Sequence, residues 1–194
     1  MSQNFHPEVI GEWSDPVEFV VDRSDEVMLA ALAAHGFSNL DDEMVDSWLA
    51  ARARPPVSEL APSFHLASRL EMLETTHHMS GRSGPQVEER LRQTSLYRPD
   101  LDLVVLDEED RVAAYGLFWF DPVTATGLVE PMRTEDSFQR RGLARHVLTA
   151  GLDLLAKAGA ERIKIAFSPD NVPAARLYKD VGFLSVRPCA VVSR

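Results

Sequence analysis

The stretch from residue 126 to residue 167 restricts the fold of this chain more than any other part of the sequence. Residues 126–134 form an apolar, strand-like segment, and a charged loop around Gly142 leads from it into an amphipathic helix over residues 142–157. Ala158-Gly159-Ala160 ends that helix, and the segment ERIKIAF (161–167) alternates apolar and charged side chains, as a half-buried strand does. This order of strand, helix and strand predicts a sheet with helices packed on its faces.

The flanking segments extend the predicted sheet. Asn171 is placed to cap a further helix that runs to about residue 181, and a last strand interrupted by Pro188 follows Gly182. Upstream, acidic and proline-containing turns separate apolar segments in the manner of an antiparallel meander. The elements expected there are strands over 101–106, 112–120 and 126–134, a helix over 86–97 and a mobile loop over 75–85. We therefore predict an α/β (α+β) fold with a mixed, mostly antiparallel sheet flanked by helices.

The first 55 residues repeat the order of elements seen at the C-terminal end. A strand over 17–22, a helix over 24–35 ended by Gly36-Phe37, and a strand over 44–50 follow the layout around Gly182-Phe183. We expect 1–55 to be a partial repeat or extension, 56–62 a proline-bounded linker, and 63–194 the main domain. An unrelated helical extension is the alternative interpretation of the first segment.

Charge and cysteine content exclude several classes of function. The formal net charge is −10, which argues against nucleic acid or an anionic membrane surface as a partner. The chain has one cysteine, Cys189, and no cluster with zinc spacing, so no metal is expected; the adjacent His77 and His78 are interpreted as an exposed pair. Residues 1–16 lack a positive start and an apolar core, and no apolar run approaches the roughly 20 residues of a membrane span, which predicts a cytoplasmic protein.

The segment EPMRTEDSFQRRGLAR (130–145) has the layout of an anion-binding site. It brings a loop with QxxGxA spacing directly to the start of a helix, where free backbone N–H groups and the helix dipole attract negative charge. Gly142 leaves room for the close approach of a pyrophosphate, and nearby arginines add positive charge. Trp119 and Phe120 end the preceding strand, where they line an acceptor pocket or pack in the core.

Two motifs together make the chain resemble the GNAT superfamily of N-acetyltransferases over about residues 63–194. The acetyl-CoA loop pattern of that family, Q/RxxGxG/A, matches Gln139, Gly142 and Ala144. A second pattern, NxxAxxLYxxxGF, matches a set of residues after the next strand: Asn171, Ala174, Leu177, Tyr178, Gly182 and Phe183. The family usually has a proline where this chain has Asp136. The stretch 97–105 (YRPDLDLVV) also resembles actinobacterial members that occur as tandem repeats, which agrees with a truncated N-terminal half.

The resemblance implies a reaction and a set of site residues. It implies direct attack of an amine on the thioester of acetyl-CoA, the acyl donor, with no covalent enzyme intermediate, so Cys189 need not be catalytic. The residues assigned to acetyl-CoA are Met132, Arg133, Thr134, Gln139, Arg140, Arg141, Gly142, Leu143, Ala144, Arg145 and Asn171. Tyr178 is assigned as the acid that protonates the leaving thiolate, or alternatively as a core tyrosine. Glu130 is assigned as general base, or alternatively as a solvated or ion-paired carboxylate.

Two other functions stay open at this point. One is a protein that binds acyl-CoA without catalysis, and the other is an interaction protein whose residues 1–55 add a strand to another chain. The sequence does not identify the acceptor beyond a small-molecule or peptide amine, and uncovered strand edges are compatible with a homodimer.

Overall fold

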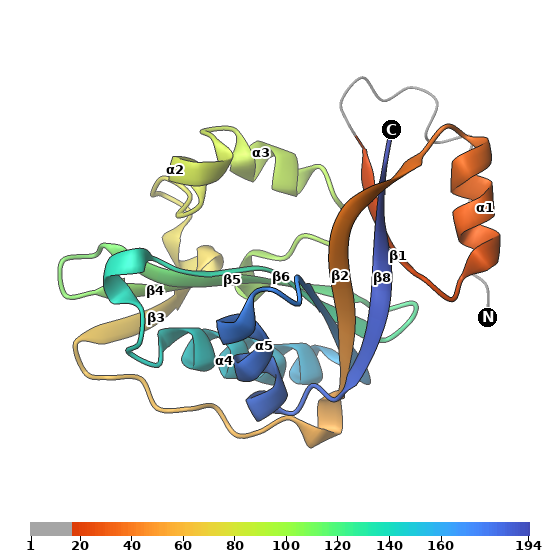
Figure 1. Ribbon diagram of the computed structural model, residues 1–194. Helices are drawn as coiled ribbons and strands as arrows, with labels where there is room; N and C mark the ends of the chain where they lie inside the picture. Colours follow the sequence, from red (N-terminus) through yellow and green to blue (C-terminus); the bar gives the residue numbers. More distant parts are fainter. Residues whose placement is uncertain (1–16) are drawn as a thin grey trace. The chain divides into compact units, whose positions relative to one another are not determined.

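The computed structural model describes residues 17–194, shown as a ribbon in Figure 1. Residues 1–16, for which no leader segment is predicted, lie outside the described part. The strands are Glu18–Asp22 (β1), Ser38–Ala50 (β2), Phe64–Ser68 (β3), Asp102–Asp107 (β4), Val112–Asp121 (β5), Thr126–Thr134 (β6), Arg162–Phe167 (β7) and Ser185–Ser193 (β8). The helices are Glu26–Ala34 (α1), Ser80–Ser83 (α2), Val87–Arg92 (α3), Leu143–Ala158 (α4) and Val172–Val181 (α5). Single helical turns occur at Ala51–Ala53 (η2), Arg69–Met72 (η3), Pro99–Leu101 (η4) and Asp136–Phe138 (η5).

The chain divides into two compact units. The larger unit contains residues 48–165 and 177–184, and its strands have the order β7-β6-β5-β4-β3. The contacts from β3 to β6 are antiparallel, and β6 pairs in parallel with β7. The predicted mixed, mostly antiparallel sheet with flanking helices is confirmed.

Helix α4 covers one face of the larger unit's sheet, and α2 and α3 lie over the other face (Figure 1). The buried side of α4 includes Leu148, Leu152 and Leu155, spaced as one face of a helix. Gly151 sits between them, and a methyl group there would come within 2.0 Å of the Phe118 ring on β5. The absence of a side chain at Gly151 therefore sets how closely the helix approaches the strand.

The second unit joins the two ends of the described chain. It contains residues 17–47, 166–176 and 185–194, and its strands have the order β1-β8-β2. Antiparallel pairing places Val21 of β1 opposite Ala190 of β8. Leu32 of α1 and Phe37 pack with them in a buried cluster. Gly36 and Gly182 both have positive φ and both precede a buried phenylalanine, the feature on which the predicted repeat rests.

Two predictions of local structure were wrong. The helix predicted over 86–97 covers only Val87–Arg92, because the Thr94 hydroxyl accepts a hydrogen bond from the Leu96 amide and competes with helical pairing. The segment 75–85, predicted as a mobile loop, contains α2 and the buried residues His77 and Met79. No helix within residues 17–194 is long and apolar enough to span a membrane.

Candidate functional site

Strand β6 changes its pairing in the middle. Its parallel pairing with β7 covers Thr126 to Val129, which lies opposite Ile165. On the other side, Gly116 pairs with Met132 and Phe118 with Val129, so Glu130 and Pro131 both lie opposite the single residue Leu117. This is a β-bulge, which bends the strand and re-aims its side chains. The Glu130–Pro131 peptide bond is cis. Beyond the bulge, β6 leads to the predicted cofactor loop.

The cofactor loop has two residues with left-handed backbone conformation. Arg140 has φ 65° and Gly142 has φ 81°. Gly142 is the residue before α4, and no side chain of the described residues caps this helix end through a hydrogen bond. Alternating left-handed conformations turn successive N–H groups toward one side, where they form an anion-binding concavity. A methyl group added at Gly142 would have no atom within 4 Å, so the space above it is open.

The arginines of the loop take different positions. Arg140 is exposed, whereas the Arg141 guanidinium lies over the rings of Phe138 and Phe64 at 5.6 and 6.0 Å from their centroids. Arg145, in the first turn of α4, lies 3.5 Å from the carboxylate of Asp180 on α5. That contact brings the α5 turn that carries Tyr178 next to the start of α4.

Carboxylates hold the strand end that precedes the loop. Arg133 pairs with Glu135 at 3.1 Å and with Asp136 at 3.5 Å, and Arg82 of α2 pairs with Glu135 at 2.9 Å. These arginines lower the pKa of Glu135. The neighbouring Thr134 hydroxyl is buried and has no hydrogen-bond partner among residues 17–194. An unpaired buried hydroxyl next to the loop is compatible with a bound polar group.

The two predicted catalytic residues differ in environment. Tyr178 is 8% exposed, its ring contacts Phe183, and burial raises the pKa of its phenol. Glu130 is exposed at the bulge, where its carbonyl oxygen accepts a hydrogen bond from the indole N–H of Trp119 at 2.7 Å. Asn171 accepts a hydrogen bond from the Ala174 amide at 3.2 Å, and so caps α5 as predicted.

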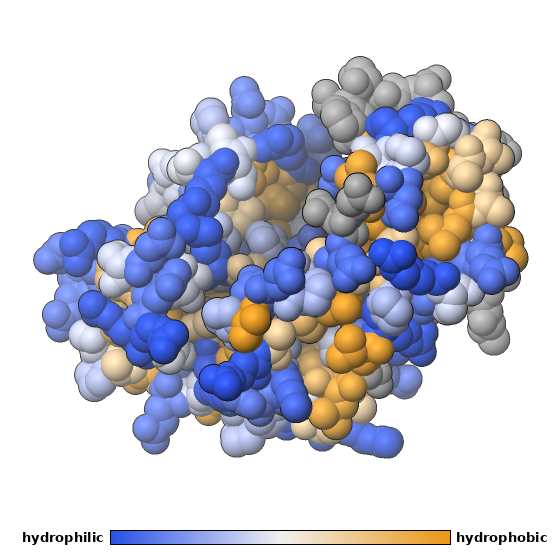
Figure 2. All heavy atoms as spheres, in the orientation of Figure 1, coloured by the Kyte–Doolittle hydropathy of each residue, from blue (hydrophilic) through white to orange (hydrophobic). Residues whose placement is uncertain are grey.

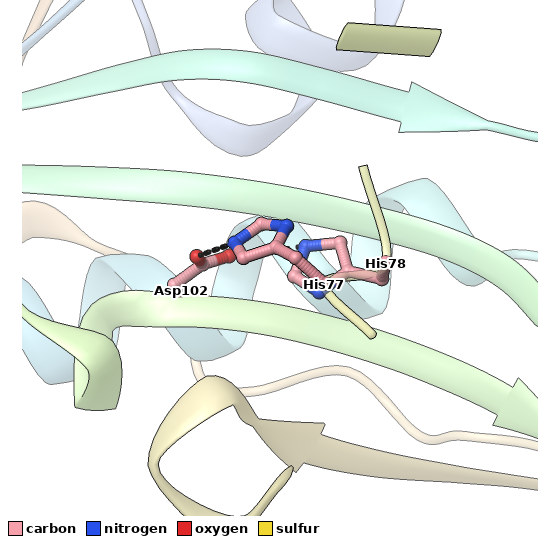
Figure 3. A group of neighbouring side chains, drawn as sticks. All are labelled: His77, His78 and Asp102. Carbon is pink, nitrogen blue, oxygen red and sulfur yellow. Dashed lines mark hydrogen bonds and ion pairs between the residues drawn. The ribbon is translucent and has the colours of Figure 1, made fainter. Parts of the chain in front are cut away.

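The structure corrects the interpretation of His77 and His78 as an exposed pair. Their side chains are 1% and 2% exposed, and they stack at 4.4 Å between centroids beside the fully buried Asp102 (Figure 3). These three side chains are close enough to be considered as metal ligands. The sequence contained a signal for this cluster: Asp102 is the only charged residue in the apolar run LDLVVL (101–106), and a buried carboxylate requires partners.

A cavity of about 370 Å³ lies beside the loop. Its lining residues are Ser63, Phe64, Asp107, Glu108, Glu109, Arg111, Ser137, Phe138 and Arg141. The lining combines three carboxylates with two guanidinium groups, so its own charge does not select an anion. The adjoining surface over η5 is mainly hydrophilic (Figure 2).

Comparisons with known proteins identify the family of the chain. The sequence model of the Acetyltransferase (GNAT) family matches residues 67–183. The chain is 32% identical over 87 residues to a mycothiol acetyltransferase of Clavibacter michiganensis subsp. michiganensis, and the aligned region covers 45% of this chain and 28% of that protein. It is 29% identical over 90 residues to a mycothiol acetyltransferase of Beutenbergia cavernae, which covers 46% of this chain and 30% of that protein. The chain thus spans less than a third of these relatives.

Solved structures share the fold. A tandem GNAT protein from the clavulanic acid biosynthesis pathway superposes with a TM-score of 0.67 at 12% identity, over 92% of this chain and 63% of that one. A GCN5-related N-acetyltransferase from Sphaerobacter thermophilus gives 0.62 at 13% identity, over 92% of this chain and 59% of that one.

Proposed function

Because the chain belongs to the GNAT family of acetyltransferases, we propose that it transfers an acetyl group from acetyl-CoA to an amine of a small molecule or peptide. The observation that carries the proposal is the loop before α4. Two left-handed residues and an uncapped helix start present N–H groups toward open space, and a pyrophosphate is the anion that this arrangement suits.

Each assigned residue has a task in this reaction. The main chain of β6 at Met132, Arg133 and Thr134 holds the pantetheine arm, beyond the point where β6 stops pairing with β7. The loop and first helical turn bind the pyrophosphate through the assigned residues: Gln139, Arg140, Arg141, Gly142, Leu143, Ala144 and Arg145. Asn171 supports the site by starting α5, the helix of Tyr178.

The chemical step is direct attack of the acceptor nitrogen on the thioester carbonyl. A carbon–nitrogen bond forms, the carbon–sulfur bond breaks, and the acceptor nitrogen loses a proton, directly or through water, to Glu130. Tyr178 donates a proton to the leaving thiolate. Burial raises the pKa of the Tyr178 phenol, so the phenol carries its proton at neutral pH. The same shift makes the phenol a weaker acid, so the developing charge on the sulfur has to drive the proton transfer.

Calorimetric titration with acetyl-CoA and with CoA tests the proposal. Gly142→Asp places a side chain and a negative charge where the pyrophosphate binds, and should abolish measurable binding. Gly84→Asp is the matched control, because Gly84 also has a positive φ and an added side chain there would also enter open space. Failure of the folded wild-type protein to bind either ligand would refute the proposal.

Turnover separates the enzyme from the protein that only binds acyl-CoA. A screen of amines with detection of free thiol should find an acceptor whose acetylation releases CoA. Binding of acetyl-CoA without turnover on any amine class would favour the non-catalytic alternative. The strand-addition alternative has less support, because β1 already pairs with β8 of the same chain.

A further inference from the structure

The buried carboxylate of Asp102 collects hydrogen-bond donors from two other segments. Its side chain is fully buried at the start of β4. His77 Nε2 lies 2.9 Å from Oδ2 and His78 Nε2 lies 3.1 Å from Oδ1 (Figure 3). The Tyr97 hydroxyl also lies 2.9 Å from Oδ2. Burial raises the pKa of Asp102, but His77 and His78 together lower it further, to about 2. Asp102 is therefore an anion that fixes the segment before α2 and the segment after α3 onto the sheet.

The hydrogen bonds of His77 argue against a metal ion held by all three residues. The Met79 amide donates to His77 Nδ1 at 3.1 Å, so the proton of a neutral ring lies on Nε2, which donates to Asp102. A metal bound at Nε2 would displace the proton from that nitrogen to Nδ1. A protonated Nδ1 could no longer accept the hydrogen bond from the Met79 amide. The contact between His78 Nε2 and Asp102 Oδ1 lacks good hydrogen-bond angles, although a small ring rotation with the proton on Nε2 would pair both atoms.

The Tyr97 ring connects this cluster to the candidate active site. It contacts Trp119 with centroids 6.3 Å apart and a tilt of 59°. The Trp119 indole N–H donates to the carbonyl oxygen of Glu130 at 2.7 Å. That carbonyl belongs to the bulge at which β6 stops pairing with β7. A continuous series of contacts thus runs from Asp102 through two aromatic rings to the bent part of β6.

We propose that Tyr97 and Trp119 are positioning residues that transmit the fixed position of Asp102 to the Glu130–Pro131 bulge, and so shape the acyl end of the acetyl-CoA site. Trp119 suits this role because an indole is a donor only and has two apolar faces, so one ring both packs on Tyr97 and orients a carbonyl. The assignment of the bulge to the acyl end of the acetyl-CoA site depends on the proposed function. The contacts that lead from Asp102 to the bulge are independent of it.

Indole N–H resonances of ¹⁵N-labelled full-length protein test the series of contacts without an acceptor. Trp119→Phe assigns its signal among those of three tryptophans. Tyr97→Phe keeps the ring but removes the hydrogen bond to Asp102, and should shift the Trp119 signal and accelerate its solvent exchange about tenfold. Val104→Ala is the control: it removes methyl groups of a fully buried residue of β4 and should leave the signal in place.

A binding measurement tests whether Trp119 shapes the acyl end of the acetyl-CoA site. Trp119→Phe should leave the Kd for CoA within about twofold of wild type and reduce the preference for acetyl-CoA over CoA. An unchanged Trp119 signal in Tyr97→Phe, or an unchanged preference in Trp119→Phe, would overturn the proposal. Stoichiometric Zn²⁺ binding that His78→Gln abolishes would do the same, because it would assign the cluster to a metal. If wild type binds neither CoA nor acetyl-CoA, the proposed function fails while the shift of the Trp119 signal still reports on the contacts.

Discussion

At the scale of single residues, Tyr178 carries the clearest catalytic prediction. Tyr178→Phe removes the phenolic proton while keeping the buried ring against Phe183. With an acceptor identified, we expect kcat to fall roughly a hundredfold and the Kd for acetyl-CoA to stay within about twofold. Tyr115→Phe, which removes the hydroxyl of another buried tyrosine, is the control. Equal turnover in Tyr178→Phe and wild type would leave Tyr178 as a core residue only.

Asp102 predicts a specific response to acid. Its pKa is lowered from 3.8 to about 2 in the folded protein, so its charge stabilises the fold above about pH 4, and this stabilisation is lost as the pH falls through 2. The shift corresponds to about 2 kcal/mol. Urea unfolding of wild type and Asp102→Asn should show a difference in unfolding free energy that is constant near neutral pH and narrows between pH 4 and 2. A difference that does not narrow between pH 4 and 2 would contradict this role of the Asp102 charge.

At the scale of elements, the packing of α4 on β5 depends on Gly151. Alanine is normally favoured over glycine in a helix by about 1 kcal/mol. At Gly151 the added methyl group would overlap Phe118, and overpacking of this kind costs about 1–3 kcal/mol. Gly151→Ala should therefore lower the free energy of unfolding measured by denaturant titration. Gly81→Ala, where the methyl group enters open space on α2, should leave stability equal or raise it. A stabilised Gly151→Ala protein would contradict this account of the packing.

The elements show which parts of a fold a sequence can predict. Strand β6, helix α4 and helix α5 were predicted closely because their periodicity, caps and glycine stops are local signals. The polar segment 75–85 was misjudged because the burial of His77 depends on Asp102, a partner 25 positions away. The loop was identified from its motif, whereas the relation of Trp119 to the Glu130 carbonyl depends on a bulge that periodicity does not reveal.

At the scale of the whole molecule, strands from the two ends of the described chain pair with each other. β8 lies between β1 and β2 in strand order, so the C-terminal strand obtains its neighbours from the first 50 residues. A partial repeat would produce such pairing. In each copy a helix that ends in glycine and phenylalanine is followed by a strand, and the two strands, β2 and β8, belong to one sheet. The predicted domain boundary at residues 56–62 stays a prediction, and so do the cytoplasmic location and the homodimer.

The single cysteine can be used to test the pairing of β1 with β8. Cys189 is fully buried on β8 opposite Asp22 of β1, so we expect separation of β1 from β8 to make its thiol more accessible. Val21→Asp puts a carboxylate into the buried cluster of this unit and should weaken that pairing. We expect the rate of thiol labelling to rise at least tenfold. Val20→Asp, on the same strand but 39% exposed, is the matched control and should label as wild type does. If both variants label at the wild-type rate, β1 does not protect Cys189, and the idea that this N-terminal strand covers β8 would have to be abandoned.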